Sequence, residues 1–226
     1  MQAQTPPRTV SFDVYSALID SRSGGTRAFA ALAEQRGWAV DASEAYARWD
    51  AICKDLQRRV VSYVSFRALA GQAMEQALTE LGLDADPRSA TEALLATIGS
   101  WPHYDDVPDA VAQVAQTHPV ALLTNIDDDL LARTVTGYPF TDAITSEAAR
   151  CYKPSPEIYR FAERRLGPLV HVAASARDVR GSLEAGLDVV RVVRPGHRVD
   201  PEGPQPQWVI DDLGALPETL ARLEDG

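Results

Sequence analysis

Unbroken runs of apolar residues alternate along most of the chain with segments in which apolar residues recur every three or four positions. The runs lack the alternation of a sheet that has one solvated face, so they are typical of a parallel sheet covered on both faces. We expect strands at 9–15, 119–125, 169–175, 188–194 and 208–210.

The segments with the three-to-four-residue spacing predict helices between and after these strands. Strands that alternate with helices are typical of an α/β fold with a doubly wound, Rossmann-like parallel sheet, which is the fold that we expect. The predicted core helices lie at 105–116, 127–136, 155–166, 178–186 and 214–223.

A long helical segment separates the first two predicted strands. From residue 23 to residue 98 the pattern is helical, with Gly, Asp and Pro between successive helices. We therefore expect residues 23–98 to form a helical cap subdomain inserted after the first strand. Residues 1–22 and 99–226 would form the α/β core domain, in which the Pro- and Gly-rich stretch 194–207 is interpreted as a surface loop.

Length and charge narrow the class of protein. The 226 residues, 45% of them hydrophobic, suffice for one soluble core with an inserted subdomain. The 32 acidic against 22 basic residues give a net charge of −10, which argues against nucleic acid or an anionic membrane as a partner. The N-terminal residues do not resemble a signal peptide, and no apolar run could span a bilayer, so we expect a cytoplasmic protein. The sequence is also compatible with a homodimer.

Cysteine and histidine give no sign of a metal or thiol site. Cys53 and Cys151 have neither zinc-site nor disulfide-framework spacing. The basic run 54–59 is interpreted as a solvated helix face. The histidines show neither triad nor metal-ligand spacing and are interpreted as structural; they are His103, His118, His171 and His197.

Polar residues follow the predicted strands, and the carboxyl ends of parallel strands are where ligands bind in an open α/β sheet. An aspartate ends the first strand, two polar residues end the second, and two more follow the third, while a lysine precedes the helix at 155. These residues are Asp13, Thr124, Asn125, Ser175, Asp178 and Lys153.

Together these residues predict an active site. Asp13 would be the nucleophile, Lys153 would keep it ionised and in place, and Asp178 would balance Lys153 and help to orient a water molecule. Each residue alone has another explanation, because Asp often caps a helix or forms a turn and Lys is often a surface charge. Their recurrence at successive strand ends favours the active-site interpretation.

Four stretches of the chain resemble the motifs of the haloacid dehalogenase superfamily. In chain order they are "SFDVYSALID", "LLTN", "YKPSPEIY" and "ASARDVRGSLEAGL". The resemblance implies the α/β fold and the helical cap already expected from the pattern. It also implies that Thr124 and Asn125 correspond to the Ser-Asn of the second motif, and Tyr159 to a pocket tyrosine.

Tyr15 and Ala174 decide between branches of the superfamily. Its phosphatases carry a second Asp two residues after the nucleophile and a further metal-binding Asp in the fourth motif; here these positions are Tyr15 and Ala174. A phosphate ester needs Mg²⁺ to neutralise its charge and an acid to protonate the leaving group, whereas a halide leaves unaided. The chain therefore resembles the L-2-haloacid dehalogenase branch, which implies a small carboxylate substrate and neither metal nor other cofactor.

The motifs also depart from that branch. Where its first motif continues Tyr-Gly-Thr, this chain has Ser16 and Ala17 after the tyrosine. Where its fourth motif reads Ser-Ser-Asn, this chain has Ala173, Ala174 and Ser175. These changes fall at positions that shape the pocket, so they signify either a different substrate or lost activity.

The cap carries the largest departure. A Trp-Arg pair that grips the substrate in this branch corresponds here to Trp49 and Asp50, which reverses a charge. Another cation must then hold a substrate carboxylate, and Arg22, between the first strand and the cap, is the candidate. Asp50 would be free to receive an ammonium group.

Several functions follow from this pattern. The leading hypothesis is a cofactor-independent hydrolase that forms an ester on Asp13 and cleaves the carbon–halogen bond of a small carboxylate. The alternatives are hydrolysis of an activated carbon–nitrogen bond in a small cyclic amino acid, a phosphatase of the same superfamily, and a non-catalytic binding protein that keeps the fold.

Overall fold

The computed structural model describes residues 7–134 and 137–225, which contain a six-stranded sheet in the order β3-β2-β1-β4-β5-β6. Every neighbouring pair of strands is parallel. The doubly wound α/β fold expected from the sequence is thereby confirmed. The strands are β1 (Thr9–Phe12), β2 (Val120–Thr124), β3 (Asp142–Thr145), β4 (Leu169–Ala173), β5 (Asp188–Val192) and β6 (Trp208–Ile210).

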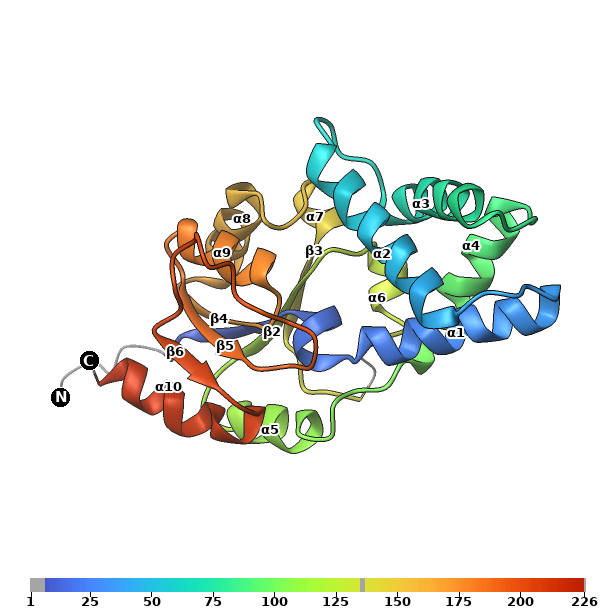
Figure 1. Cartoon of the computed structure of the whole chain (residues 1–226). Helices are drawn as coiled ribbons and strands as arrows, with labels where there is room; N and C mark the ends of the chain where they lie inside the picture. Colours follow the sequence, from blue (N-terminus) through green and yellow to red (C-terminus); the bar gives the residue numbers. More distant parts are fainter. Residues whose placement is uncertain (1–6, 135–136, 226) are drawn as a thin grey trace.

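Helices cover both faces of the sheet (Figure 1). One face packs against α8 (Pro156–Leu166) and α9 (Ala176–Glu184), and the other against α5 (Val107–Val114) and α10 (Leu216–Glu224). The central strands β1, β2 and β4 are buried along their whole length because water reaches neither face of the sheet there.

Two core elements differ from the expected pattern. Strand β3 was not predicted, because it begins with the charged Asp142 and has too few apolar residues to form a run. The predicted helix 127–136 is only the short α6 (Asp128–Leu131), followed by turns; its last two residues lie outside the described part of the chain, as does most of the N-terminal segment 1–8. A second short helix, α7 (Ser146–Ala149), follows β3.

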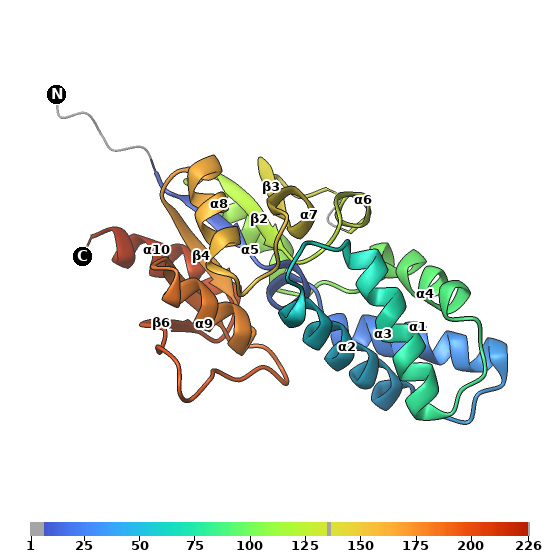
Figure 2. The ribbon, with the colours of Figure 1, turned by 90° about the horizontal axis from the view of Figure 1, so that it is seen from above.

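Of the α-helices between β1 and β2, the first four form a layer beside the sheet (Figures 1 and 2). They begin at Ser21 and end at Ala96, close to the limits expected for the cap, and we call them the cap helices. Each begins after an Asp or Ser whose side chain accepts a hydrogen bond from a first-turn amide, which is the standard N-cap chemistry. They are α1 (Ser21–Arg36), α2 (Ala42–Arg59), α3 (Phe66–Leu81) and α4 (Pro87–Ala96).

The cap helices meet the core at a cluster of buried aromatic rings. Tyr46 packs edge-to-face on Trp101 and at a tilt on Trp49. Helix α1 approaches this cluster through two glycines: a Cβ at Gly24 would lie 2.4 Å from Cγ of Trp101, and one at Gly25 would lie 2.0 Å from Cε2 of Tyr46. Only glycine permits this approach.

Arg194 joins the end of β5 to the segment that follows β1. Its guanidinium forms two hydrogen bonds to the Asp106 carboxylate, at 2.9 Å each, and two to the Ala17 carbonyl, at 3.0 and 2.8 Å. It also stacks over Tyr104. The expected surface loop 194–207 therefore begins with a buried anchor. No helix within the described ranges is both long and apolar enough for a membrane crossing.

A matched pair of glycine substitutions tests the close approach of α1. We expect Gly25→Ala to destabilise the protein by about 1–3 kcal/mol, because the new methyl group overlaps Tyr46, whose ring is held in the aromatic cluster. Gly71→Ala in α3 is the control: the nearest atom is 4.0 Å away, so alanine's higher helix propensity should stabilise the protein by about 0.5–1 kcal/mol. Urea unfolding of both variants measures the sign of each change in the free energy of unfolding. Equal changes in the two variants would contradict the packing argument.

Candidate active site

Asp13 lies at the centre of the sheet, directly after β1. Its amide donates to the Val172 carbonyl of β4 at 2.9 Å, which extends the ladder by one residue. The expected strand 9–15 ends before it, because the chain then turns through a π-helical segment at Val14–Leu18. The Ser16 hydroxyl of this turn donates to Oδ2 of Asp13. The turn thus fixes the carboxylate at the carboxyl edge of the sheet.

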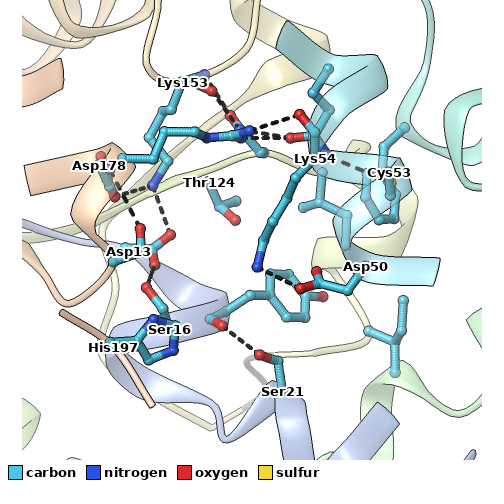
Figure 3. A pocket seen from close by; sticks show the side chains of 18 of the residues that line it. Asp13, Ser16, Ser21, Asp50, Cys53, Lys54, Thr124, Lys153, Asp178 and His197 are labelled. Atoms are coloured by element: carbon cyan, nitrogen blue, oxygen red, sulfur yellow. Dashed lines mark hydrogen bonds and ion pairs between the residues drawn. The ribbon is translucent and has the colours of Figure 1, made fainter. Parts of the chain in front are cut away.

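Lys153 joins Asp13 to Asp178 (Figure 3). Its ammonium lies 2.7 Å from Oδ1 of Asp13, 2.6 Å from Oδ2 of Asp178 and 2.8 Å from the Leu123 carbonyl oxygen. Burial disfavours the charged ammonium, but the Coulomb attraction of Asp13 and Asp178 outweighs it, so the pKa of Lys153 is raised. The lysine therefore stays protonated and pairs with both carboxylates.

Asp178 has both carboxylate oxygens engaged. Tyr159 donates its hydroxyl to Oδ1 at 2.8 Å, and Nε2 of His171 lies 3.2 Å from the Oδ2 that Lys153 also contacts. Burial would raise the pKa of Asp178, but Lys153 and His171 outweigh it and lower the pKa well below its ordinary range. Asp178 is thus a weak base held by three neighbours, which fits its predicted role of balancing Lys153 better than the orientation of a water molecule.

Asn125 holds the backbone of Lys153. Its Oδ1 accepts from the Lys153 amide at 2.7 Å, and its Nδ2 donates to the Lys153 carbonyl at 3.0 Å. The same Nδ2 lies 3.2 Å from Oε1 of Gln57, which belongs to the cap helix α2. Asn125 therefore sets the position of the lysine and links it to the cap.

A cavity of about 220 Å³ lies between the sheet edge and the cap helices, with the Asp13 carboxylate in its wall. Most of the side chains predicted for the site line it, including several whose sequence separation is large. The predicted residues in its wall are Asp13, Tyr15, Trp49, Asp50, Thr124, Asn125, Lys153, Ser175 and Asp178.

Two of the predicted substrate-binding residues lie elsewhere. Arg22 is exposed and does not line the cavity; its guanidinium instead approaches Gly196. Tyr159 is fully buried behind Asp178, to which it donates its hydrogen bond, so it too is absent from the wall. The predicted location of Arg22 differs from the observed one because helix α1 begins at Ser21, and the Arg22 side chain on its first turn points outward.

The polar side chains in the cavity wall differ in whether they form hydrogen bonds within the protein. Ser175 caps α9 by accepting from the Asp178 amide, and the Tyr15 hydroxyl lies 3.0 Å from Oγ1 of Thr134. Burial raises the pKa of Tyr15 strongly, so it remains a neutral phenol. The Thr124 hydroxyl, in contrast, is buried without a hydrogen-bond partner among the described residues (Figure 3). A group of this kind is available to a ligand.

Sequence reasoning missed part of the face of α2 that lines the cavity. Trp49, Cys53 and Gln57 recur at four-residue spacing, and this periodicity would have placed Gln57 beside the predicted Trp49. The basic run 54–59 is therefore only partly a solvated face, because Gln57 is buried and Lys54 reaches the cavity, where it pairs with Asp50 at 2.6 Å. Burial raises the pKa of the Cys53 thiol to about 12, so it is not a thiolate nucleophile.

Two further wall residues come from the core. Arg177 immediately precedes Asp178 at the start of α9, and His197 comes from the loop that follows β5. Burial lowers the pKa of His197, which favours a neutral imidazole. The interpretation of the histidines as structural did not anticipate that His197 lines the cavity. His171 also contacts Asp178 directly.

The donor set does not fit a magnesium ion. Asp13 and Asp178 are the carboxylates at the sheet edge, and the ammonium of Lys153 lies between them, where it would repel a cation. Tyr15 and Ala174 supply no further carboxylate, and the described residues contain no cluster of three or more His, Cys, Asp or Glu that could hold a metal. Mg²⁺ prefers several oxygen ligands in near-octahedral geometry.

A buried lysine between two aspartates, at the carboxyl edge of a doubly wound sheet and beneath inserted helices, is the kind of site expected of an α/β enzyme. Sequence comparison identifies the family: the model of the haloacid dehalogenase-like hydrolases matches residues 7–186, so the chain belongs to that family of hydrolases.

Individual relatives agree with this assignment. The chain is 24% identical over 225 residues to (S)-2-haloacid dehalogenase 4A of Burkholderia cepacia, covering 95% of each chain. It is 29% identical over 210 residues to the (S)-2-haloacid dehalogenase of Xanthobacter autotrophicus, covering 83% of this chain and 75% of the relative. The solved L-2-haloacid dehalogenase of Xanthobacter autotrophicus with chloropropionic acid covalently bound shares the fold, with a TM-score of 0.82, 22% identity, and coverage of 95% and 98%.

The lowered pKa of Asp178 predicts how the folded protein responds to acid. Its stabilising ion pair is fully present above the unfolded-state pKa of about 3.9 and is lost as the pH falls through the lower folded-state pKa. We expect Asp178→Asn to lower the free energy of unfolding at pH 7, and the difference from wild type to shrink as the pH falls below about 4. Urea titrations from neutral to acid pH measure this; a difference that does not vary with pH would contradict it.

Proposed function

We propose that this protein is a metal-independent 2-haloacid dehalogenase in which Asp13 is the nucleophile. The observation that carries the proposal is the Asp13 carboxylate, fixed by Lys153 and Ser16 in the wall of the cavity between the sheet edge and the cap helices. The relatives are named as 2-haloacid dehalogenases, which suggests that the bond cleaved is a carbon–halogen bond. Tyr15 argues against a phosphate ester, because a tyrosine at this position offers no carboxylic acid to protonate a leaving alkoxide.

In the first step, an oxygen of the Asp13 carboxylate attacks C2 of the haloacid. A carbon–oxygen bond forms as the carbon–halogen bond breaks, and the halide leaves with the bonding electron pair. Lys153 keeps Asp13 ionised without a proton transfer, and Asp178 holds the lysine in place. The product of this step is an ester between Asp13 and the 2-carbon of the substrate.

In the second step, water adds to the ester carbonyl of Asp13, and the ester collapses to a 2-hydroxy acid and the free carboxylate. The water supplies the hydroxyl group that stays on Asp13, and one proton is released overall. Lys153 stabilises the oxyanion that forms on the former carboxylate oxygen, because its ammonium is already within hydrogen-bond distance of Oδ1. Asp13 is thereby regenerated.

The cavity suits a small substrate. Its volume of about 220 Å³ is below the roughly 300–1,000 Å³ typical of pockets for drug-sized ligands. Its apolar wall includes Phe66, Ile98 and Trp101, against which a short carbon chain and a halogen can pack. The unpaired hydroxyl of Thr124 is available as a hydrogen-bonding group for the substrate's polar end.

A second candidate is favoured by one observation. Asp50 lines the cavity where an anionic group would not assist a haloacid, and it could receive the ammonium of an amino-acid-like substrate. A strained, protonated cyclic amine would leave from carbon without an acid, as a halide does. Asp50 is already paired with Lys54, which would have to release it. The haloacid therefore ranks first.

Isotope labelling tests the ester intermediate. With enzyme in excess in ¹⁸O-water, a single turnover should give a 2-hydroxy acid whose new oxygen is unlabelled, because it comes from Asp13. Over many turnovers the label should accumulate in the Asp13 carboxylate and then in the product, which mass spectrometry of peptides and product measures. Label in the product from the first turnover would show direct attack by water. Asp13→Asn should abolish turnover with an unchanged fold.

Substrate and metal dependence are tested in one screen. We expect (S)-2-chloropropionate to be hydrolysed at the same rate with and without EDTA, because the donor set around Asp13 does not fit Mg²⁺. The screen includes a phosphate ester and a small cyclic amino acid as competing substrates, with halide, phosphate and amine release measured separately. Phosphate release restored by Mg²⁺ would replace the proposal with a phosphatase, and release of an amine would move the second candidate to first place.

A further inference from the structure

Arg177 is a cation of the cavity wall with no carboxylate partner among the residues that the structure describes. It precedes Asp178 at the start of α9, and its guanidinium donates to the Gln57 side chain at 2.7 Å and to the Lys54 carbonyl at 3.1 Å. Both acceptors are neutral. Within the described residues it forms no ion pair, unlike Lys153, which has two carboxylates, and Lys54, which has Asp50.

The charge of Arg177 is therefore poorly compensated where it lies. Burial lowers its pKa, and the Coulomb attraction of Asp178, Tyr159 and Asp50 offsets only part of that effect. The two aspartates are engaged by their own lysines. An arginine remains protonated at neutral pH, and a partly buried charge without a counter-ion is unfavourable. An anion that enters the cavity would relieve this cost.

We propose that Arg177 binds the carboxylate of the substrate and determines the enzyme's preference for acids. The identity of the substrate rests on the proposed function, but the anion-binding role rests on Arg177 itself. The guanidinium has five N–H donors, of which the two observed hydrogen bonds use only part, so donors remain for a carboxylate. The core helix α9 would thus supply the cation that the cap does not supply at Asp50.

Gln57 positions this arginine. Its Oε1 accepts from both Arg177 and Asn125, so one buried side chain of the cap helix α2 contacts both the proposed anion site and the residue that holds Lys153. The carboxylate would therefore be bound at a fixed distance from the nucleophile. A carboxylate introduced at position 57 would pair with Arg177 and compete with the substrate.

Direct binding separates this role from catalysis. The probe is (S)-2-chloropropionate, titrated calorimetrically into Asp13→Asn, which should not turn it over. In the Asp13→Asn/Arg177→Gln double variant, we expect the affinity for the acid to fall by about 10- to 100-fold, the usual consequence of losing a charged hydrogen bond. The affinity for the uncharged 2-chloropropionamide should stay unchanged, because it presents no charge to Arg177.

Two further variants control the experiment. Arg180→Gln, in the same Asp13→Asn background, removes an exposed arginine of α9 that pairs with Glu184 and Asp200, and the acid affinity should not change. Gln57→Glu places a carboxylate beside Arg177 and should weaken binding of the acid but not of the amide. It also provides the test if the Arg177 variant fails to fold, because it leaves the arginine in place.

The outcomes separate this inference from the proposed function. Equal affinity for the acid with and without Arg177, or an equal loss for acid and amide, would overturn the anion-binding role even if wild type hydrolyses haloacids. No binding of the acid to Asp13→Asn would overturn it as well. If wild type hydrolyses no haloacid but Asp13→Asn binds the acid in an Arg177-dependent way, the proposed function fails and the inference stands.

Discussion

The ammonium of Lys153 between two buried carboxylates is the interaction on which the site depends. Its positive charge offsets the repulsion between Asp13 and Asp178 at the sheet edge, because like charges in a buried site strongly disfavour each other. Removing one member of such a buried set leaves an uncompensated charge. The strand order, which places β1 between β2 and β4, brings these three residues together from distant parts of the sequence.

Other features of the fold maintain that arrangement. Asn125 clamps both backbone polar groups of Lys153, while Tyr159 and His171 hold Asp178 from behind. Arg194 binds the Ala17 carbonyl and so fixes the turn that carries Ser16. Most of the polar groups near the Asp13 carboxylate are thus engaged in hydrogen bonds within the protein, and only a few side chains of the cavity wall remain available to a ligand.

The sequence predicted the centre of the site better than its boundary. Asp13 and Asn125 directly follow buried parallel strands, so their common edge follows from the parallel sheet alone. Strand β3 was missed because Asp142, which pairs with Arg165, interrupts an apolar run too short to recognise. Arg177 was missed for a different reason: its importance lies in a contact with Gln57, on a helix distant in sequence, and only Gln57 has a local signature, its four-residue spacing from Cys53.

The shared acceptor on Gln57 has a consequence for the timing of turnover. Part of the cavity wall comes from α2 and part from the core, so a movement of α2 away from the sheet would break the bonds from Gln57 to Arg177 and Asn125 together. Entry of one anion and departure of another would then draw on the same opening motion. Such an opening motion would set an upper limit on the rate of turnover, however fast the bond cleavage itself.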